Sequence, residues 1–334
     1  MTHLIETMNL YGAEEIPFLF IIDFECKKPI IIPIASINPD EILYDIDGFT
    51  NAPETDIKKF HNLVDTEKYF IKSKEPVSFE RYAKAFNFVQ KNQREGNSYL
   101  TNLTFPTKIA LNASLRDIFH ESKATFKLYI KNKLVVFSPE SFVSIKNSAI
   151  SSYPMKGTID ADLPGAKEKI IANEKEFSEH VTIVDLIRND LHMVATDVTV
   201  NRFRYLDTIH TSEKTLLQVS SEITGKLPKD YQKKIGSILL KLLPAGSICG
   251  APKKKTVEII KNAEQYDRGY YTGIFGYCHG SLLRSAVMIR FIEKIKDDFY
   301  YKSGGGITVY SNAEEEYQEL LDKVYVPITG NIES

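Results

Sequence analysis

The segment TGIFGYCHGSLLRSAVMIRFIEKIKDDFYYK, residues 272–302, decides the fold class. Apolar and aromatic residues dominate three parts of it, 272–277, 285–292 and 299–302, as is typical of β-strands. Turns that contain glycine or the dipeptide His-Gly separate these parts, so the strands do not alternate with helices. This pattern favours an α+β fold over a doubly wound parallel sheet.

The rest of the chain adds both strands and helices to this segment. Four further stretches have the composition of strands or extended chain: 16–24, 30–34, 99–104 and a hairpin at 125–137. Four stretches have apolar residues at helical spacing: 78–95, 174–191, 235–243 and 314–324. Ser78 supplies an N-cap for the first of these helices.

Composition excludes several classes of protein. The 334 residues carry a formal net charge of −2, which gives no overall attraction to nucleic acid or to an anionic membrane. The three cysteines lack CxxC spacing, so neither a disulfide framework nor a zinc site is indicated. The apolar run 16–24 is far too short to span a bilayer, and the N-terminus has no basic signal region. We expect a reduced, cytoplasmic protein.

Residues 154–158, Pro-Met-Lys-Gly-Thr, place a lysine in an unusual turn. Proline fixes its own φ, and Gly157 permits backbone angles and close ligand approach that a Cβ would obstruct. Lys156 could be a solvated turn residue, an anion anchor or a nucleophile. The pentapeptide alone favours the first reading, because most lysines are solvated.

Two pairs of acidic residues have helical i, i+3 spacing. Glu176 and Glu179 share one face of a helix, and Glu316 and Glu319 share a face of the last helix. Carboxylates from two helices would make an oxygen-rich site for Mg²⁺, which takes few protein ligands. Spacing alone favours ordinary solvated helix faces.

Two glycine segments and one arginine could bind anions. Residues 244–253, PAGSICGAPK, lead into a helix near Pro252 but lack the Walker spacing of a nucleotide site. The run Ser303–Gly306 follows a strand, and its backbone amides could form an anion nest. Arg290 lies in an apolar strand, where it could grip a carboxylate or pair with a core acid.

These segments together resemble the chorismate-utilising enzymes, the family that includes anthranilate, isochorismate, salicylate and aminodeoxychorismate synthases. Eight pieces match in family order over roughly the last two hundred residues. They are Ser138-Pro139-Glu140, 154–158, EH-x4-DLIRNDL at 179–191, 221–225, 244–253, 268–277, 287–290 and GGGIT with ExxE-x3-K at 304–323. The resemblance implies two packed antiparallel β-sheets flanked by helices. It divides the chain into an abbreviated N-terminal region, 1–75, packed on a catalytic domain, 76–334.

Lys156 selects one branch of the family. Most branches carry alanine there, and lysine is similar to component I of aminodeoxychorismate synthases, in the route to 4-aminobenzoate and folate. The implied reaction converts chorismate and ammonia to 4-amino-4-deoxychorismate and water. In it, the Lys156 amine attacks ring C2, and Glu140 protonates the departing hydroxyl. The amine must be neutral, so we expect its pKa to be lowered.

The resemblance also assigns the binding residues. Mg²⁺ held by Glu179 and Glu319 would bind the ring carboxylate of chorismate. The further substrate-binding residues implied are Gly157, Thr158, Gly250, Tyr271, Arg290, Gly304, Gly305, Gly306 and Lys323. Of these, Arg290 and Tyr271 would hold the enolpyruvyl carboxylate. Gln218 departs from a histidine common in the family, and Cys249 from a serine or threonine, so neither position carries an assigned role.

The sequence leaves three alternative functions, each with an argument against it, and implies one protein partner. Anthranilate synthase component I is the nearest enzymatic alternative, disfavoured by Lys156. A nucleic-acid-binding module based on Lys253–Lys255 is disfavoured by the balanced charge. An inactive regulatory homologue is disfavoured by the intact Lys156 and Glu140. Because the sequence has no recognisable glutaminase constellation, we expect ammonia from a separate glutamine amidotransferase or from solution.

Overall fold

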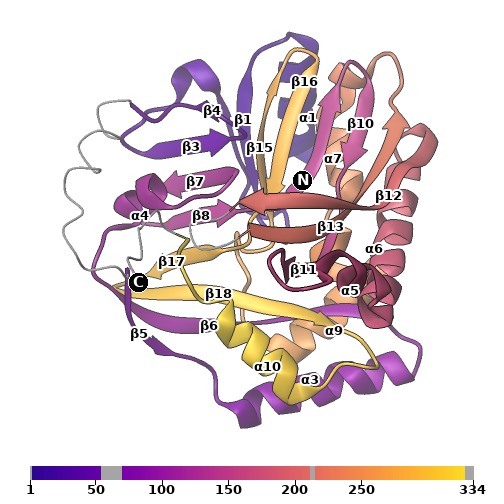
Figure 1. Cartoon of the computed structure of the whole chain (residues 1–334). Coiled ribbons are helices and arrows are strands. Elements are labelled where there is room, and N and C mark those ends of the chain that lie inside the picture. The colour runs from indigo at the N-terminus through magenta and orange to yellow at the C-terminus, as the bar shows by residue number, and fades with distance from the viewer. Residues whose placement is uncertain (1, 54–69, 211–214, 328–334) are drawn as a thin grey trace.

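The computed structural model describes residues 2–53, 70–210 and 215–327, which form two antiparallel sheets packed against each other (Figure 1). The first sheet has nine strands, in spatial order β11 (Met155–Asp160), β13 (Thr215–Lys226), β10 (Ala149–Ser152), β9 (Ser141–Lys146), β16 (Leu282–Val287), β15 (Ile274–His279), β1 (Phe18–Ile22) and β2 (Ile30–Pro33), with β12 (Thr196–His210) paired to β13. The second has nine more, in the order β14 (Gly250–Ala251), β6 (Leu100–Leu111), β18 (Asp298–Ile307), β17 (Phe291–Ile295), β8 (Leu134–Ser138), β7 (Phe126–Ile130), β3 (Ile42–Ile46) and β4 (Phe49–Thr50), with β5 (Ile71–Glu75) paired to β6. The expected α+β class and paired antiparallel sheets are confirmed.

Helices cover the outer faces of both sheets (Figure 1). Those against the first sheet are α1 (Thr2–Ala13), α5 (Ala166–Ala172), α6 (Glu174–His192) and α7 (Ile235–Leu242). Those against the second are α3 (Phe79–Arg94), α4 (Leu115–Glu121), α9 (Lys253–Glu264) and α10 (Ala313–Asp322), while the short α8 (Gly246–Cys249) contacts α6 and β6. None of these described helices is long and apolar enough to cross a membrane.

Strand β1 shows why the chain contains continuous apolar runs rather than alternating ones. Phe18, Phe20 and Ile22 join the core between the first sheet and its helices. Leu19 and Ile21 point the other way, into the core between the two sheets. Successive strand residues face opposite sides, so a strand buried on both faces must be apolar throughout.

Most of the predicted elements are confirmed within a few residues. Helix α3 begins after Ser78, whose side chain accepts a hydrogen bond from the backbone N–H of Arg81. The predicted hairpin is β7 and β8, turning at Asn132 with φ of +55°. The long hairpin of β12 and β13, by contrast, was not anticipated.

Three local predictions were wrong. The stretch 285–292 is not one strand, because the chain leaves the first sheet after Val287 and enters the second at Phe291. The glycine run 304–306 is not a loop but part of β18, paired with β6. Residues 154–158 do not form a turn: Lys156 and Gly157 form a bulge in β11, between the pairs Met155–Ser220 and Thr158–Gln218.

Candidate active site

The site lies where two neighbouring strands pass from one sheet to the other. Residues Pro139-Glu140 connect β8 to β9, and residues 288–290 connect β16 to β17. The two links run side by side: the Val287 N–H donates to the Glu140 carbonyl, and the Phe137 N–H donates to the Arg290 carbonyl, both at 3.1 Å. The crossing therefore places Glu140 and Arg290 together at the line where the sheets separate.

A cavity of about 180 Å³ opens at this line. Nine of the predicted site residues are on its wall: Glu140, Lys156, Tyr271, Arg290, Gly304, Gly305, Gly306, Glu319 and Lys323. They come from both sheets and from the helix α10, from parts of the sequence up to 183 residues apart (323 − 140). The fold thus collects most of the residues that the motifs had singled out.

Four predicted residues lie off that wall. Glu179 lies behind Lys156 and contacts its amine. Gly157 and Thr158 follow Lys156 in β11, and the Thr158 side chain is exposed to solvent. Gly250 pairs with Thr101 at the edge of the second sheet, and its φ is +110°. A Cβ at this position would lie 1.8 Å from the Leu100 carbonyl oxygen, so only glycine fits there.

Lys156 is held by carboxylates on two helices. The bulge in β11 turns its side chain toward α6, where the amine pairs with Glu179; the Lys156 side chain is 31% exposed and that of Glu179 11%. Burial lowers the pKa of Lys156, but Glu179, Glu176 and Glu319 outweigh it, so the net pKa is raised. The expected lowering is wrong for the substrate-free protein, because three negative side chains surround the amine.

Glu140 has the environment of a general acid. Burial raises the pKa of its carboxyl group, which favours the protonated form, although the side chain keeps some contact with the cavity. The Ser247 hydroxyl donates a 2.6 Å hydrogen bond to Glu140 Oε1 and lowers the pKa in part, as do the charges of Arg290, Lys323 and Lys156. The raised pKa favours the protonated form that a general acid needs.

Arg290 has the free charge that an anion site needs. Its backbone lies in the left-handed region, with φ of +51°, at the crossing between the sheets. No carboxylate in the described parts of the chain forms an ion pair with it, so the salt bridge weighed as an alternative is not found there. Its guanidinium carbon lies 5.4 Å from the centroid of the Tyr325 ring.

The carboxylate pairs of α6 and α10 lie close to the strands that carry Lys156 and the glycine run. An ideal Cβ on Gly157 would lie 3.2 Å from Glu176 Oε2, and one on Gly305 would lie 3.1 Å from Glu316 Oε2 and 3.7 Å from Glu319 Oε1. Glycine at both positions thus lets the helices bring their acids close to the strands. Lys323 pairs with Glu319 at 2.5 Å and donates to the Gly304 carbonyl at 2.9 Å.

These acids supply the type of donor atom that a divalent cation binds, but their side chains are not arranged as a metal site. Glu176 Oε2 is buried and has no hydrogen-bond partner among the described residues, which is costly unless something else satisfies it. Carboxylate oxygens are the donors that Mg²⁺ takes. In the described ranges, however, no three acidic, histidine or cysteine side chains converge as a ready-made metal site, and Glu179 and Glu319 each pair with a lysine.

Strand β18 offers backbone groups instead of a glycine nest. One edge of 304–306 is paired with β6, while β17 pairs with β18 only as far as Lys302. The Gly304 carbonyl reaches Lys323, so this residue points to the edge that β17 leaves open. Because the N–H and C=O of a residue in an antiparallel strand share an edge, the Gly304 amide faces the same side.

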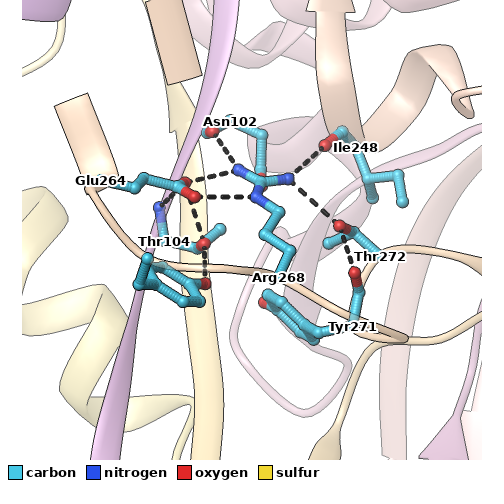
Figure 2. Close-up of polar contacts among 8 residues, drawn as sticks. Asn102, Thr104, Ile248, Glu264, Arg268, Tyr271 and Thr272 are labelled. Atoms are coloured by element: carbon cyan, nitrogen blue, oxygen red, sulfur yellow. Dashed lines mark hydrogen bonds and ion pairs between the residues drawn. The ribbon is translucent and has the colours of Figure 1, made fainter. Parts of the chain in front are cut away.

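The motifs did not single out several other residues on the wall. They include Asn102, Ser247, Thr272 and Lys302. Asn102 and Thr272 accept hydrogen bonds from the buried side chain of Arg268, which Figure 2 shows at the centre of a network joining Asn102, Ile248, Glu264 and Thr272. Lys302 donates to the backbone carbonyl of Arg268. Arg290 was identified as a candidate because a charged residue stands among apolar strand residues. Lys302 follows the strand-like residues 299–301 in the same way, so the same criterion could have identified it.

The basic cluster at 253–255 is largely neutralised. Lys253 pairs with Asp190 at 2.7 Å and donates to the Leu242 carbonyl, and Lys255 pairs with Glu258. These contacts leave little of the cluster for a nucleic-acid backbone. The two departures from the family pattern lie beside the site: Gln218 pairs with Thr158 in the sheet, and Cys249 is buried, which raises the pKa of its thiol to about 11.

Comparisons with known proteins agree with this geometry. A family model described as chorismate binding enzyme matches residues 47–329. An uncharacterized PabA-like protein of Haemophilus influenzae is 51% identical over 330 residues, which are 99% of this chain and 98% of that protein. Aminodeoxychorismate synthase component 1 of Escherichia coli is 30% identical over 262 residues, 73% of this chain but only 56% of that enzyme.

The fold has a similar counterpart among solved structures. The menaquinone-specific isochorismate synthase of Escherichia coli superposes with a TM-score of 0.71 over 96% of this chain and 80% of that protein, at 14% identity. At that identity the likeness concerns the fold alone. The family model matches residues 47–329, which include the residues around the cavity. This chain therefore belongs to the chorismate-binding enzyme family.

Proposed function

We propose that this enzyme converts chorismate and ammonia to 4-amino-4-deoxychorismate and water. The observation that carries the proposal is Lys156, whose amine reaches the cavity that Glu140 and Arg290 also line. A lysine there supplies a nucleophile that branches with alanine at this position lack. The relatives named aminodeoxychorismate synthase component 1 support the same assignment.

Lys156 and Glu140 carry the proposed chemistry. The Lys156 amine forms a bond to ring C2, the two ring double bonds shift from C1–C2 and C5–C6 to C1–C6 and C4–C5, and the C4–O bond breaks as Glu140 gives its proton to the departing hydroxyl. Ammonia then bonds to C4, the C2–N bond breaks and returns the amine, and the Glu140 carboxylate takes a proton from the new ammonium group. Attack requires a neutral amine, so Lys156 must first be released from its pairing with Glu179.

The charged groups around the cavity suit a substrate with two carboxylates. Arg290 and the Tyr271 hydroxyl would hold the enolpyruvyl carboxylate, which keeps that side chain on the ring. Lys323 and the open edge of 304–306 would face the ring carboxylate. Glu179 and Glu319 would hold Mg²⁺, with Glu176 close by, and the bound ion would neutralise the negative charge of that carboxylate.

Ammonia would come from a partner. The relatives that share the component 1 name are parts of two-component systems by that name. We infer that a separate glutamine amidotransferase supplies ammonia to this chain. Purified protein that forms product from glutamine with no second protein would contradict the need for a partner.

One incubation tests the reaction. Purified protein is mixed with chorismate, MgCl₂ and ammonium chloride, and the products are separated by liquid chromatography and identified by mass. We expect 4-amino-4-deoxychorismate, converted to 4-aminobenzoate only after a lyase is added. Anthranilate, detected by its fluorescence without an added lyase, would instead establish the anthranilate synthase reaction and refute the proposal.

A further inference from the structure

Arg268 is a buried cation whose hydrogen bonds tie the wall of the cavity together (Figure 2). The residue is only 3% exposed and follows α9. Its guanidinium forms a two-point ion pair with Glu264, with Nε to Oε2 at 2.9 Å and Nη2 to Oε1 at 2.5 Å. Glu264 Oε1 also accepts hydrogen bonds from the backbone N–H and hydroxyl of Thr104 on β6. The buried carboxylate and guanidinium therefore satisfy each other.

The remaining donors of Arg268 reach three separate parts of the wall. Nη2 donates to the Asn102 carbonyl at 2.8 Å, and Nη1 donates to the Ile248 carbonyl at 3.4 Å and to the Thr272 hydroxyl at 3.2 Å. Asn102, Ile248 and Thr272 all line the cavity, on β6, on α8 and before β15 respectively. A single guanidinium thus fixes three wall segments that are distant in sequence.

Thr272 has a backbone conformation that its neighbours must hold. Its φ is +61°, in the left-handed region, where a β-branched residue is a genuine outlier. Its N–H donates to the Met288 carbonyl at 2.8 Å, and its hydroxyl, which accepts from Arg268, donates to the Tyr271 carbonyl at 2.6 Å. Strained residues of this kind persist only where surrounding contacts determine them, and they cluster at ligand sites.

The hydrogen bonds form a chain from the ion pair to the tyrosine. Arg268 donates to Thr272, and Thr272 donates to Tyr271, whose ring lies on the cavity wall against Phe291 at 5.7 Å between centroids. A second buried cation holds the beginning of the same segment, because Lys302 donates to the Arg268 carbonyl at 2.9 Å and pairs with Glu293 at 2.7 Å. The segment that carries Tyr271 is therefore fixed at both ends.

We propose that Arg268, paired with Glu264, is a positioning residue that sets Tyr271 for the substrate through the hydroxyl and the strained backbone of Thr272. The inference rests on the proposed function, in which Tyr271 helps to hold the enolpyruvyl carboxylate. Arg268 touches no substrate itself, because the wall residues Asn102, Ile248 and Thr272 lie between it and the cavity. Arg268 keeps the Tyr271 side chain in its binding orientation before the substrate arrives, so substrate binding does not pay the entropic cost of ordering that side chain.

The first test replaces Thr272 by valine, which keeps the shape and removes the hydroxyl. Chorismate binding is measured by calorimetry with MgCl₂ and without ammonia, beside a thermal unfolding curve. We expect a Kd about 10-fold higher than that of the wild type, equivalent to losing one well-placed hydrogen bond. The matched control is Thr107→Val, because Thr107 is equally buried, on β6, and its hydroxyl has no hydrogen-bond partner among the described residues. Its Kd should stay at the wild-type value.

The second test separates positioning from simple loss of packing. Arg268→Lys keeps the charge but not the forked donor, and we expect it to raise the Kd by a similar factor. Adding Thr272→Val to Arg268→Lys should then raise the Kd little further, since both act through one chain of hydrogen bonds. An unchanged Kd in folded Thr272→Val, equal weakening in Thr107→Val, or fully additive effects in the double variant would overturn the proposal.

The same measurements distinguish this inference from the proposed reaction. Calorimetry needs only chorismate binding, so it reports on Arg268 and Thr272 whichever product the enzyme makes. Absence of aminodeoxychorismate from wild-type reactions would refute the reaction and leave the comparison of Kd values intact. In steady-state kinetics, the positioning role predicts that KM for chorismate rises more than kcat falls.

Discussion

Lys156 is the residue on which the proposed reaction depends, and its removal is the most direct test. Lys156→Ala should lower aminodeoxychorismate formation on the order of 100-fold or more, because the ring would lose its covalent nucleophile. Any remaining product would come from direct attack by ammonia, with a different product ratio, measured by liquid chromatography. Lys146→Ala is the control, since Lys146 is exposed at the far end of β9. An unchanged rate and product would contradict the nucleophile assignment.

Ser247 should tune the pH dependence through Glu140. As a general acid, Glu140 acts while protonated, so kcat/KM should fall as pH rises through its pKa. Burial raises this pKa, and the hydrogen bond from Ser247 lowers it by stabilising the carboxylate. Ser247→Ala removes that stabilisation, raises the pKa further and moves the alkaline limb to higher pH. Ser152→Ala, which loses a bond to the Phe142 carbonyl instead, should leave the limb in place. A limb that moved to lower pH would contradict the assignment.

At the scale of the element, the bulge in β11 aims Lys156, and Gly157 makes that bulge possible. Gly157→Ala should lower the free energy of unfolding by about 1–2 kcal/mol, because φ there is +78°. It should also lower kcat, since the new methyl group would crowd Glu176 beside the amine. Gly96→Ala is matched in φ, at +77°, but its Cβ would meet nothing within 4 Å. Urea unfolding should show similar losses in both variants, and only Gly157→Ala should lose activity.

The elements also show what sequence could and could not predict. The sequence identifies Phe18–Ile22 as a strand because every residue in it is apolar, and the residues are all apolar because both faces of the strand are buried. The break at 288–290 has no such mark, since Met288 and Ile289 are as apolar as the strands around them, and only the separation of the two sheets ends the strand there. Gly304–Gly306 has the composition of a loop, but pairing with β6 overrides that local preference.

The site was predictable where a motif marked it. Lys156, Glu140 and Arg290 lie in segments that resemble the family, and all three line the cavity. Asn102 is a single polar residue in a strand, a pattern common throughout the chain, so nothing in the sequence set it apart. Ser247 lies in the family-like segment 244–253, but the resemblance assigned no role to it. Their importance comes from which segments the fold brings together.

At the scale of the whole molecule, the two sheets depend on the N-terminal residues. Strand β1 pairs with both β15 and β2 inside the first sheet, and β3 pairs with β7 in the second. All five residues of β1 are buried. At about 1.5–3 kcal/mol for each large apolar side chain, their burial is comparable to the 5–15 kcal/mol of a typical domain's net stability. Residues 76–334 should therefore not fold without 1–75.

Removing residues 1–75 tests this dependence. We expect a fragment of residues 76–334 to show no cooperative thermal transition in circular dichroism, because β15 and β7 would each lose a strand partner, leaving backbone N–H and C=O groups unpaired and apolar side chains exposed. Adding residues 1–75 as a separate chain should restore part of the transition, since the missing strands can pair in place. The full chain should unfold in a single transition, as both sheets share one core. A fragment that folded alone and bound chorismate would show instead that the catalytic half stands without β1 and β3.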